Sequence, residues 1–236
     1  DLSGPIAFMG QGIKDGANLY FRYINEQGGI HGRKIKFLVE DDGFQSPRAV
    51  QAAKKLITKD KVFCMTMNLG SASCNAMYPL LEEYKVPMLI AGTANEALAV
   101  PPRKYLFLID TGYTIQGILA VQYMMKDLKA KQPKVAVIYQ DDLTGQQWLG
   151  GVKKGCEKYG IKNILDLPYK RGAVDFSAQM AKCKEAGITY VFTHTNIREP
   201  AAIMKEAQRI QFKAVYVTDN ASQGPKVLEL AGDSVD

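Results

Sequence analysis

"KVAVIYQDDLTGQQWLGGVKKGCEKYGIKNILDLPY", residues 134–169, decides the fold class that the sequence predicts. Residues 134–140 form an apolar run typical of a buried strand, 144–160 are predicted to form a helix, and 162–169 a second strand. A strand, a helix and a strand joined by short connections predict a parallel βαβ unit. The fold class is therefore predicted to be α/β with mainly parallel sheets.

The same alternation extends through the rest of the chain. Further helices are predicted over residues 10–29, 46–60, 72–85, 112–130, 175–187, 198–210 and 224–232. Further strands are predicted over residues 34–40, 61–67, 86–92, 105–110, 189–194 and 213–219. The pattern restarts near residues 110–114, which predicts two three-layer α/β/α lobes, 1–110 and 111–236, with a ligand cleft between them. The first lobe opens on a helix, so we expect a strand before Asp1 to be missing.

Composition and charge exclude several classes of protein. The 236 residues are 47% hydrophobic and 23% charged, which is typical of a globular protein. No run approaches the ~18 consecutive apolar residues of a membrane helix. The net charge is +6, but the basic residues are scattered and no basic face is interleaved with aromatic residues, so no nucleic-acid partner is expected.

The four cysteines show no metal-binding pattern. Neither a C-x-x-C pair nor a histidine at ligand spacing occurs, so a structural zinc site is not expected. We expect Cys64 and Cys183 to be buried thiols, and the sequence leaves disulfides of these two, Cys74 and Cys156 open.

A glycine run raises the alternative of a nucleotide-binding enzyme. Gly10, Gly12 and Gly16 give G-x-G-x-x-x-G, and an acidic cluster, 39–42, ends the next predicted strand. This run is one residue longer than the dinucleotide fingerprint, which also needs a tight turn directly from strand to helix. Asp41 and Asp42 are not expected to act as a carboxylate pair, because neighbours on a strand point to opposite faces.

The ordered set of motifs resembles a known family. "DLSGPIAFMGQGIKDGANLYFRYINEQGGIHGRKIKFLVEDD", "SPRAVQAAKKLI", "GSASCNAMYPLLEEYKVPMLIAGTANEAL" and "KVAVIYQDDLTGQ" are similar to successive parts of the type I periplasmic solute-binding proteins of the branched-chain amino-acid class. The resemblance covers essentially the whole chain, and it implies a missing first strand and a missing last third. It also implies that residues 3–10 form a loop over the cleft, that the helix begins near Gly10, and that Gly12 and Gly16 are close-packing positions.

The resemblance places ligand-binding residues in the first lobe. Ser71 follows a predicted strand and precedes a helix, where its hydroxyl and the first backbone N–H groups can hold a carboxylate. Gly92 is implied to offer its carbonyl and Thr93 its hydroxyl, although the family's threonine aligns one position later. Met9, in the loop implied over the cleft, completes this set.

In the second lobe the resemblance implies that Asp219 takes the ligand's ammonium group. The family's closing tyrosines are absent, because Thr144 and His194–Asn196 stand in their places, and Tyr113 at the seam is a substitute. His194 is then expected to line the cleft. These departures suggest a ligand other than leucine, such as a more polar molecule or another small acid or amide.

The sequence therefore predicts a periplasmic or extracellular solute-binding protein of an ABC importer, whose partners are a small-molecule ligand and a membrane permease. No cofactor, no metal and no catalytic residue is implied, since no Ser–His–acid set, G-x-S-x-G or H-E-x-x-H motif occurs. The alternative is a ligand-sensing domain of a receptor or regulator with the same fold.

Overall fold

The computed structural model describes residues 1–235, apart from the side chains of Ile90, Ala91 and Val235. The chain divides into two units, Asp1–Asp110 and Thr111–Asp236, and each is described by itself. Both contain parallel sheets, which confirms the predicted α/β class.

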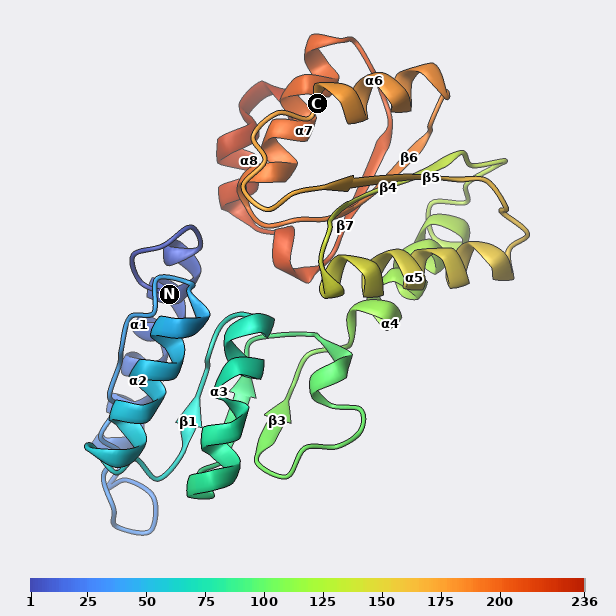
Figure 1. Ribbon diagram of the computed structural model, residues 1–236. Helices are drawn as coiled ribbons and strands as arrows, with labels where there is room; N and C mark the ends of the chain where they lie inside the picture. Colours follow the sequence, from blue (N-terminus) through green and yellow to red (C-terminus); the bar gives the residue numbers. More distant parts are fainter. Residues whose placement is uncertain (236) are drawn as a thin grey trace. The chain divides into compact units, whose positions relative to one another are not determined.

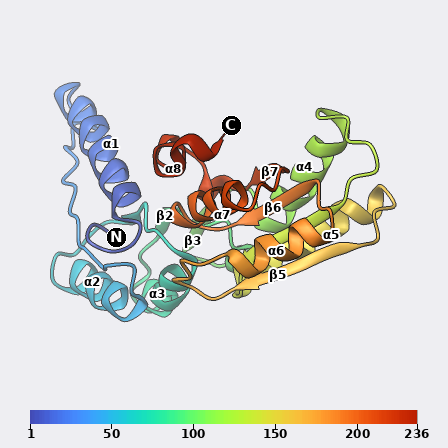
Figure 2. The ribbon, with the colours of Figure 1, turned by 90° about the horizontal axis from the view of Figure 1, so that it is seen from above.

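The first unit carries a small parallel sheet in the order β1-β2-β3. Its elements are α1 (Ala7–Glu26), α2 (Ser46–Thr58), β1 (Met65–Thr66), α3 (Ser71–Tyr84), β2 (Met88–Ala91), η1 (Glu96–Leu98) and β3 (Leu106–Leu108). Helices α2 and α3 pack side by side, as Figure 1 and Figure 2 both show. Ala53 of α2, Leu81 of α3 and Met88 of β2 lie in one buried apolar cluster that joins these helices to the sheet.

The second unit is a three-layer α/β/α structure around a sheet in the order β5-β4-β6-β7. All three neighbouring strand pairs are parallel. Its elements are α4 (Tyr113–Lys126), β4 (Val135–Gln140), α5 (Leu143–Lys158), β5 (Ile164–Tyr169), α6 (Ser177–Glu185), β6 (Tyr190–His194), α7 (Arg198–Arg209), β7 (Val215–Thr218), η2 (Asn220–Ser222), α8 (Pro225–Ala231) and η3 (Gly232–Val235). Within this unit, α4 and α5 cover one face of the sheet, and α6, α7 and α8 the other (Figure 1).

Strand β4 is buried along its whole length because it pairs with β5 on one side and β6 on the other. Two glycines let α4 and α5 pack closely against each other on the face of the sheet that they cover. A Cβ at Gly117 would lie 2.7 Å from the carbonyl oxygen of Trp148, and one at Gly151 only 2.2 Å from that of Thr114. Glycine is therefore required at both positions.

Three local predictions for the first unit are wrong. Helix α1 begins at Ala7 rather than near Gly10, so half of the expected loop, residues 7–10, is helical. Residues 34–40 form no strand, since in the described part of the chain no strand pairs with them. A Cβ at Gly12 or Gly16 would meet nothing within 4 Å, so these are not close-packing positions.

Helix α2 begins at Ser46, and its N-cap is Gln45. One prediction of side-chain burial needs correction. Cys64 is half-buried, whereas Cys183 is buried as expected. All four cysteines are free thiols. Among the described residues, no helix has both the length and the apolar character needed to cross a bilayer.

Candidate functional site

The first candidate group lies at the carboxyl ends of β1 and β2 in the first unit. Helix α3 begins at Ser71, and its N-cap is Gly70 with φ of 96°, a left-handed conformation that favours glycine. A Cβ at this position would also lie 2.7 Å from the ring of Phe44. No side-chain hydrogen bond caps α3, and the first N–H groups of a helix have no acceptor within it. This helix end is suited to an anion.

Ser71 and Thr93 form a hydroxyl pair at this end of the sheet. Their oxygens lie 2.5 Å apart, and Thr93 Oγ1 also accepts the backbone N–H of Asn95 at 3.0 Å. Thr93 is buried, whereas Ser71 is half-buried. If Thr93 donates its proton to Ser71, Ser71 keeps its own proton for an outside acceptor. The pair can therefore donate a hydrogen bond to a carboxylate.

Gly92 joins the loop after β2 to the loop after β1 through two backbone hydrogen bonds. Its N–H donates to the carbonyl of Asn68 at 2.7 Å, and its own carbonyl accepts the N–H of Gly70 at 3.2 Å. A carbonyl oxygen has two lone pairs, so one remains for a ligand. The structure thus brings Ser71, Gly92 and Thr93 together, while Met9 lies on α1 and not in a loop.

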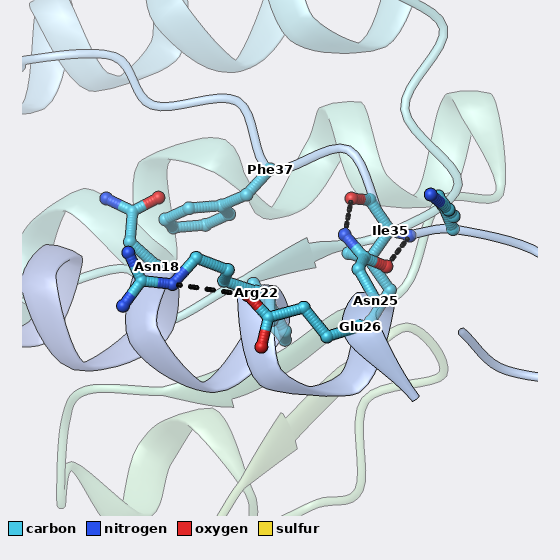
Figure 3. Close-up of a pocket in the computed structure, with 8 residues that line it drawn as sticks. Asn18, Arg22, Asn25, Glu26, Ile35 and Phe37 are labelled. Carbon is cyan, nitrogen blue, oxygen red and sulfur yellow. Dashed lines mark hydrogen bonds and ion pairs between the residues drawn. The ribbon is translucent and has the colours of Figure 1, made fainter. Parts of the chain in front are cut away.

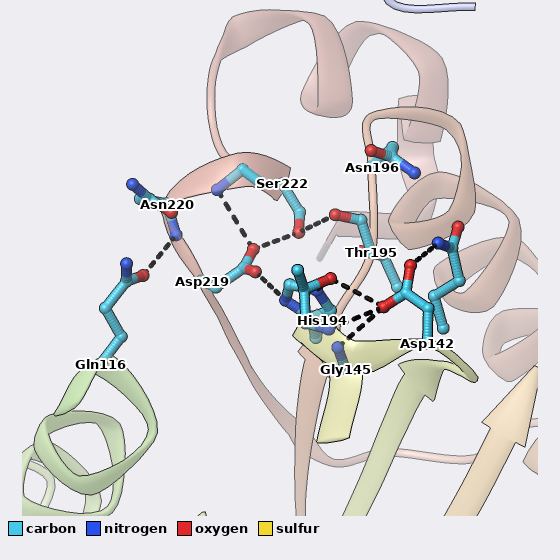
Figure 4. Close-up of polar contacts among 12 residues, drawn as sticks. Gln116, Asp142, Gly145, His194, Thr195, Asn196, Asp219, Asn220 and Ser222 are labelled. Carbon is cyan, nitrogen blue, oxygen red and sulfur yellow. Dashed lines mark hydrogen bonds and ion pairs between the residues drawn. The ribbon is translucent and has the colours of Figure 1, made fainter. Parts of the chain in front are cut away.

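The second candidate group lies at the carboxyl ends of the strands in the second unit (Figure 4). Thr193 of β6 is paired with Thr218 of β7, so the residues that follow, His194 and Asp219, are neighbours. His194 Nδ1 hydrogen-bonds to Asp219 Oδ2, and the side chains are only 7% and 0% exposed. This is a buried pair of an imidazole and a carboxylate.

Asp219 makes further hydrogen bonds with its other oxygen. Its Oδ1 accepts the N–H of Ala221 at 3.2 Å, and Ser222 Oγ lies 2.6 Å from the same atom. Ser222 Oγ is also 3.0 Å from the carbonyl oxygen of Thr195. Each oxygen of this buried carboxylate therefore has at least one partner within the protein.

Asp142 forms the other acidic part of the group. It is the N-cap of α5, and its Oδ1 accepts the N–H groups of Thr144 and Gly145, both at 3.0 Å. The Thr144 hydroxyl lies 2.7 Å from the same oxygen, and Gln140 donates to Oδ2. Burial raises the pKa of Asp142, but the hydrogen bonds from Gly145, Thr144 and Gln140, with nearby His194, outweigh it and hold the pKa below its ordinary value.

These contacts show which ring nitrogens of His194 donate when Asp219 and Asp142 are both ionised. Nδ1 faces the carboxylate of Asp219, which can only accept when ionised, so Nδ1 donates. Nε2 lies 3.0 Å from the hydroxyl oxygen of Thr144, whose one proton goes to the stronger acceptor, the ionised Asp142 carboxylate. Nε2 then donates as well. With both carboxylates ionised, the ring therefore has two donating nitrogens, the hydrogen-bonding pattern of an imidazolium ion.

Aromatic rings surround this imidazolium. Tyr113, the first residue of α4, packs edge-on against it with ring centroids 4.7 Å apart. Trp148 of α5 stacks on it at 6.4 Å and is fully buried. The structure therefore places Tyr113, Thr144, His194 and Asp219 close together at one edge of this sheet.

The sequence analysis missed Asp142, Trp148 and Ser222 as members of this group. An aspartate directly before a helix is an N-cap signal, which could have identified Asp142. Trp148 and Ser222 could not be found without knowing the strand order.

A separate hollow of about 320 Å³ lies beside α1 and the extended segment after it (Figure 3). The rings of Phe21 and Phe37 meet edge-on there at 5.2 Å, and Asn25 hydrogen-bonds the backbone of Ile35. None of the predicted site residues lines it.

The expectation for Asp41 and Asp42 is also wrong in its geometry. Residues 34–42 are not in a strand, and carboxylate oxygens of these two residues and Asp1 lie within 4.8 Å of one another. A hydrogen bond from the Ser3 hydroxyl, with backbone N–H bonds from Leu2 and Gly43, lowers the pKa of Asp41.

Parallel α/β units with polar side chains gathered at the carboxyl ends of their strands are typical of ligand-binding proteins. The chain belongs to the periplasmic binding protein family, because the family model described as "Periplasmic binding protein" matches residues 1–236. Gly10, Gly12 and Gly16, which raised the alternative of a nucleotide-binding enzyme, lie inside α1 and form no turn between a strand and a helix.

Named relatives agree with this family. The chain is 26% identical over 230 residues to an "Amino acid binding protein" of Pseudomonas aeruginosa, covering 98% of this chain and 61% of that protein. It is 26% identical to the "Leu/Ile/Val-binding protein" of Escherichia coli K12, covering 100% and 63%. These relatives are binding proteins, and the chain spans about three-fifths of their length.

Solved structures show the same fold. A fatty acid ABC transporter substrate-binding protein from Thermomonospora curvata matches with a TM-score of 0.87 and 25% identity, covering 99% of this chain and 58% of that one. A leucine-binding protein from Thermotoga maritima matches with a TM-score of 0.85 and 21% identity, covering 100% and 65%.

Proposed function

We propose that this chain is the ligand-binding part of an extracytoplasmic solute-binding protein, periplasmic or extracellular, that delivers a small carboxylate-bearing solute to the permease of an ABC importer. Membership of the periplasmic binding protein family supports this function. So do the relatives, which are named for binding amino acids or, in one solved structure, as a fatty acid transporter component.

The observation that carries the proposal is the hydroxyl pair of Ser71 and Thr93 at the start of α3. The N-cap glycine leaves the first N–H groups of α3 without a side-chain cap, and the partial positive charge of the helix end favours an anion. Ser71 adds a hydroxyl donor at the same place. In this proposal the solute's carboxylate binds there, and Gly92 and Thr93 complete the contacts.

The second unit contributes the other group of side chains. Tyr113, Thr144, His194 and Asp219 lie at the corresponding edge of its own sheet. We propose that these residues also belong to the solute-binding machinery, and that no catalytic step follows binding.

A ligand screen by thermal unfolding tests this function. Amino acids, aliphatic and aromatic carboxylic acids, amides, NAD and FAD are each added to the purified protein. A solute at 100 times its Kd stabilises the protein by about 2.7 kcal/mol, which raises the unfolding temperature measurably. We expect small carboxylates to raise it and the nucleotides to leave it unchanged.

The variant Ser71→Ala identifies the site. A hydrogen bond to a charged group contributes about 1.5–3 kcal/mol, so we expect affinity for the stabilising solute to fall at least about tenfold. Ser46→Ala is the matched control, because Ser46 is likewise a half-buried first residue of a helix in the same unit. Equal affinities of the two variants would contradict the proposal.

A further inference from the structure

The buried carboxylates in the second unit already have partners within the protein. Asp219, with no exposed side-chain surface, is bonded to His194 through one oxygen and to Ala221 and Ser222 through the other. Burying an unpaired charge is costly, and here His194 supplies the compensating cation. Each of its oxygens therefore already has a partner within the protein, and a cationic solute would have to share the carboxylate with His194.

The other acids of this group are engaged in the same way. Asp142 accepts three hydrogen bonds at Oδ1 and one from Gln140 at Oδ2. Glu199, also buried, accepts the N–H of Asn196 at 3.2 Å. Asp141, at the end of β4, is exposed to solvent, where an ion pair contributes little.

An ammonium group placed in this cluster would meet unfavourable neighbours. The imidazolium of His194 stands between the two carboxylates, through Nδ1 to Asp219 and through Thr144 to Asp142. A second cation would have to displace this ring or be repelled by it. The buried ring of Tyr113 covers the imidazolium edge-on and adds apolar surface.

We propose that His194 takes the place, within the protein, of a solute's amino group, so that the solute is a small carboxylic acid without an α-amino group. This inference rests on the proposed function, in which the carboxylate binds at Ser71. It assigns the solute class: an aliphatic or aromatic monocarboxylate whose remaining part is neutral.

Matched pairs of ligands test the inference by isothermal titration calorimetry on the wild-type protein. The pairs are leucine with 4-methylpentanoate, phenylalanine with 3-phenylpropanoate, and alanine with propanoate, which differ only in the amino group. In the pair that binds most tightly, we expect the Kd of the acid to be at least tenfold lower than that of the amino acid. If the amino acid binds equally or more tightly, the inference is overturned and the proposed function remains. If no member of any pair binds and no carboxylate raises the unfolding temperature in the thermal screen, the proposed function is overturned with it.

The variant His194→Ala tests the role of the ring itself. It frees the Asp219 carboxylate to pair with a solute ammonium, so the preference for the acid over the amino acid should shrink at least tenfold. His31→Asn is the control, since His31 is the other histidine of the chain and is exposed. An unchanged preference in a folded His194→Ala protein overturns this role.

A spectroscopic measurement on the wild-type protein remains decisive where the variant does not fold. Nitrogen-15 NMR at pH 7 should show protons on both ring nitrogens of His194, with His31 as an internal reference. A neutral His194 ring overturns the inference.

Discussion

The substitution His194→Ala removes the cation that faces Asp219 in the second unit. Both side chains are almost fully buried, so solvent screening does not weaken their interaction. Removing one member of a buried ion pair costs about 3–5 kcal/mol, because the remaining charge is left uncompensated. Asp219 keeps its bonds from Ala221 and Ser222, so we expect a loss of unfolding free energy near the lower limit, about 3 kcal/mol.

A double-mutant cycle separates this interaction from the lost ring volume. Asp219→Asn removes the charge but keeps a good N-cap residue for η2. If the pair is real, His194→Ala in the Asp219→Asn background costs much less than in the wild type, with a coupling energy of at least about 2 kcal/mol. His31→Asn is expected to change stability by less than about 0.5 kcal/mol, since exposed substitutions usually do.

Urea unfolding followed by tryptophan fluorescence measures these changes in the second unit alone. Trp148 is the one tryptophan of the sequence, is fully buried, and stacks on His194. Effects of the two substitutions that add to within about 0.5 kcal/mol would refute the buried ion pair.

Three further predictions concern packing, capping and cysteine chemistry. Gly151→Ala forces a Cβ into the backbone of α4 and should destabilise the second unit by about 1–3 kcal/mol in urea, whereas Gly150→Ala, with nothing within 4 Å, should be neutral or stabilising. Asp142→Ala removes the N-cap of α5 and should cost about 1 kcal/mol at pH 7. Because the folded-state pKa of Asp142 lies below its ordinary 3.8, this cost is complete well above pH 3.8 and shrinks as pH falls toward and through the folded value. A gap that stays the same from pH 7 to the lowest pH at which both proteins are folded contradicts the assignment. Alkylation of the native protein with iodoacetamide at pH 8, followed by mass spectrometry, should modify the half-buried Cys64 first. Burial raises the pKa of the other three thiols to about 11 or 12, so few of them are thiolates at this pH: Cys74, Cys156 and Cys183. Early labelling of any of these three would contradict their burial.

Much of the fold could be predicted from local sequence signals. The apolar run at 134–140 became the buried strand β4, and Pro79 did not prevent helix α3. The prediction failed where a partner was needed. Residues 34–40 alternate like a strand, but a strand exists only when another chain segment accepts its hydrogen bonds.

The candidate site shows the same limit. Ser71 could be found because it begins a helix shortly after the predicted strand 61–67, a local signal to which the family resemblance adds the ligand role. The pairing of His194 with Asp219 could not, because it depends on β6 and β7 being neighbours in the sheet with Thr193 opposite Thr218. Without that register, the sequence does not show whether the Asp219 carboxylate is available to a ligand's ammonium group or is already paired with a histidine.

A crystal structure of the protein with its best-bound carboxylate would locate the solute. We expect a carboxylate oxygen within about 2.6–3.2 Å of Ser71 Oγ, at the start of α3. A solute seated instead in the hollow beside Phe21 and Phe37, with no contact to Ser71, would contradict this expectation.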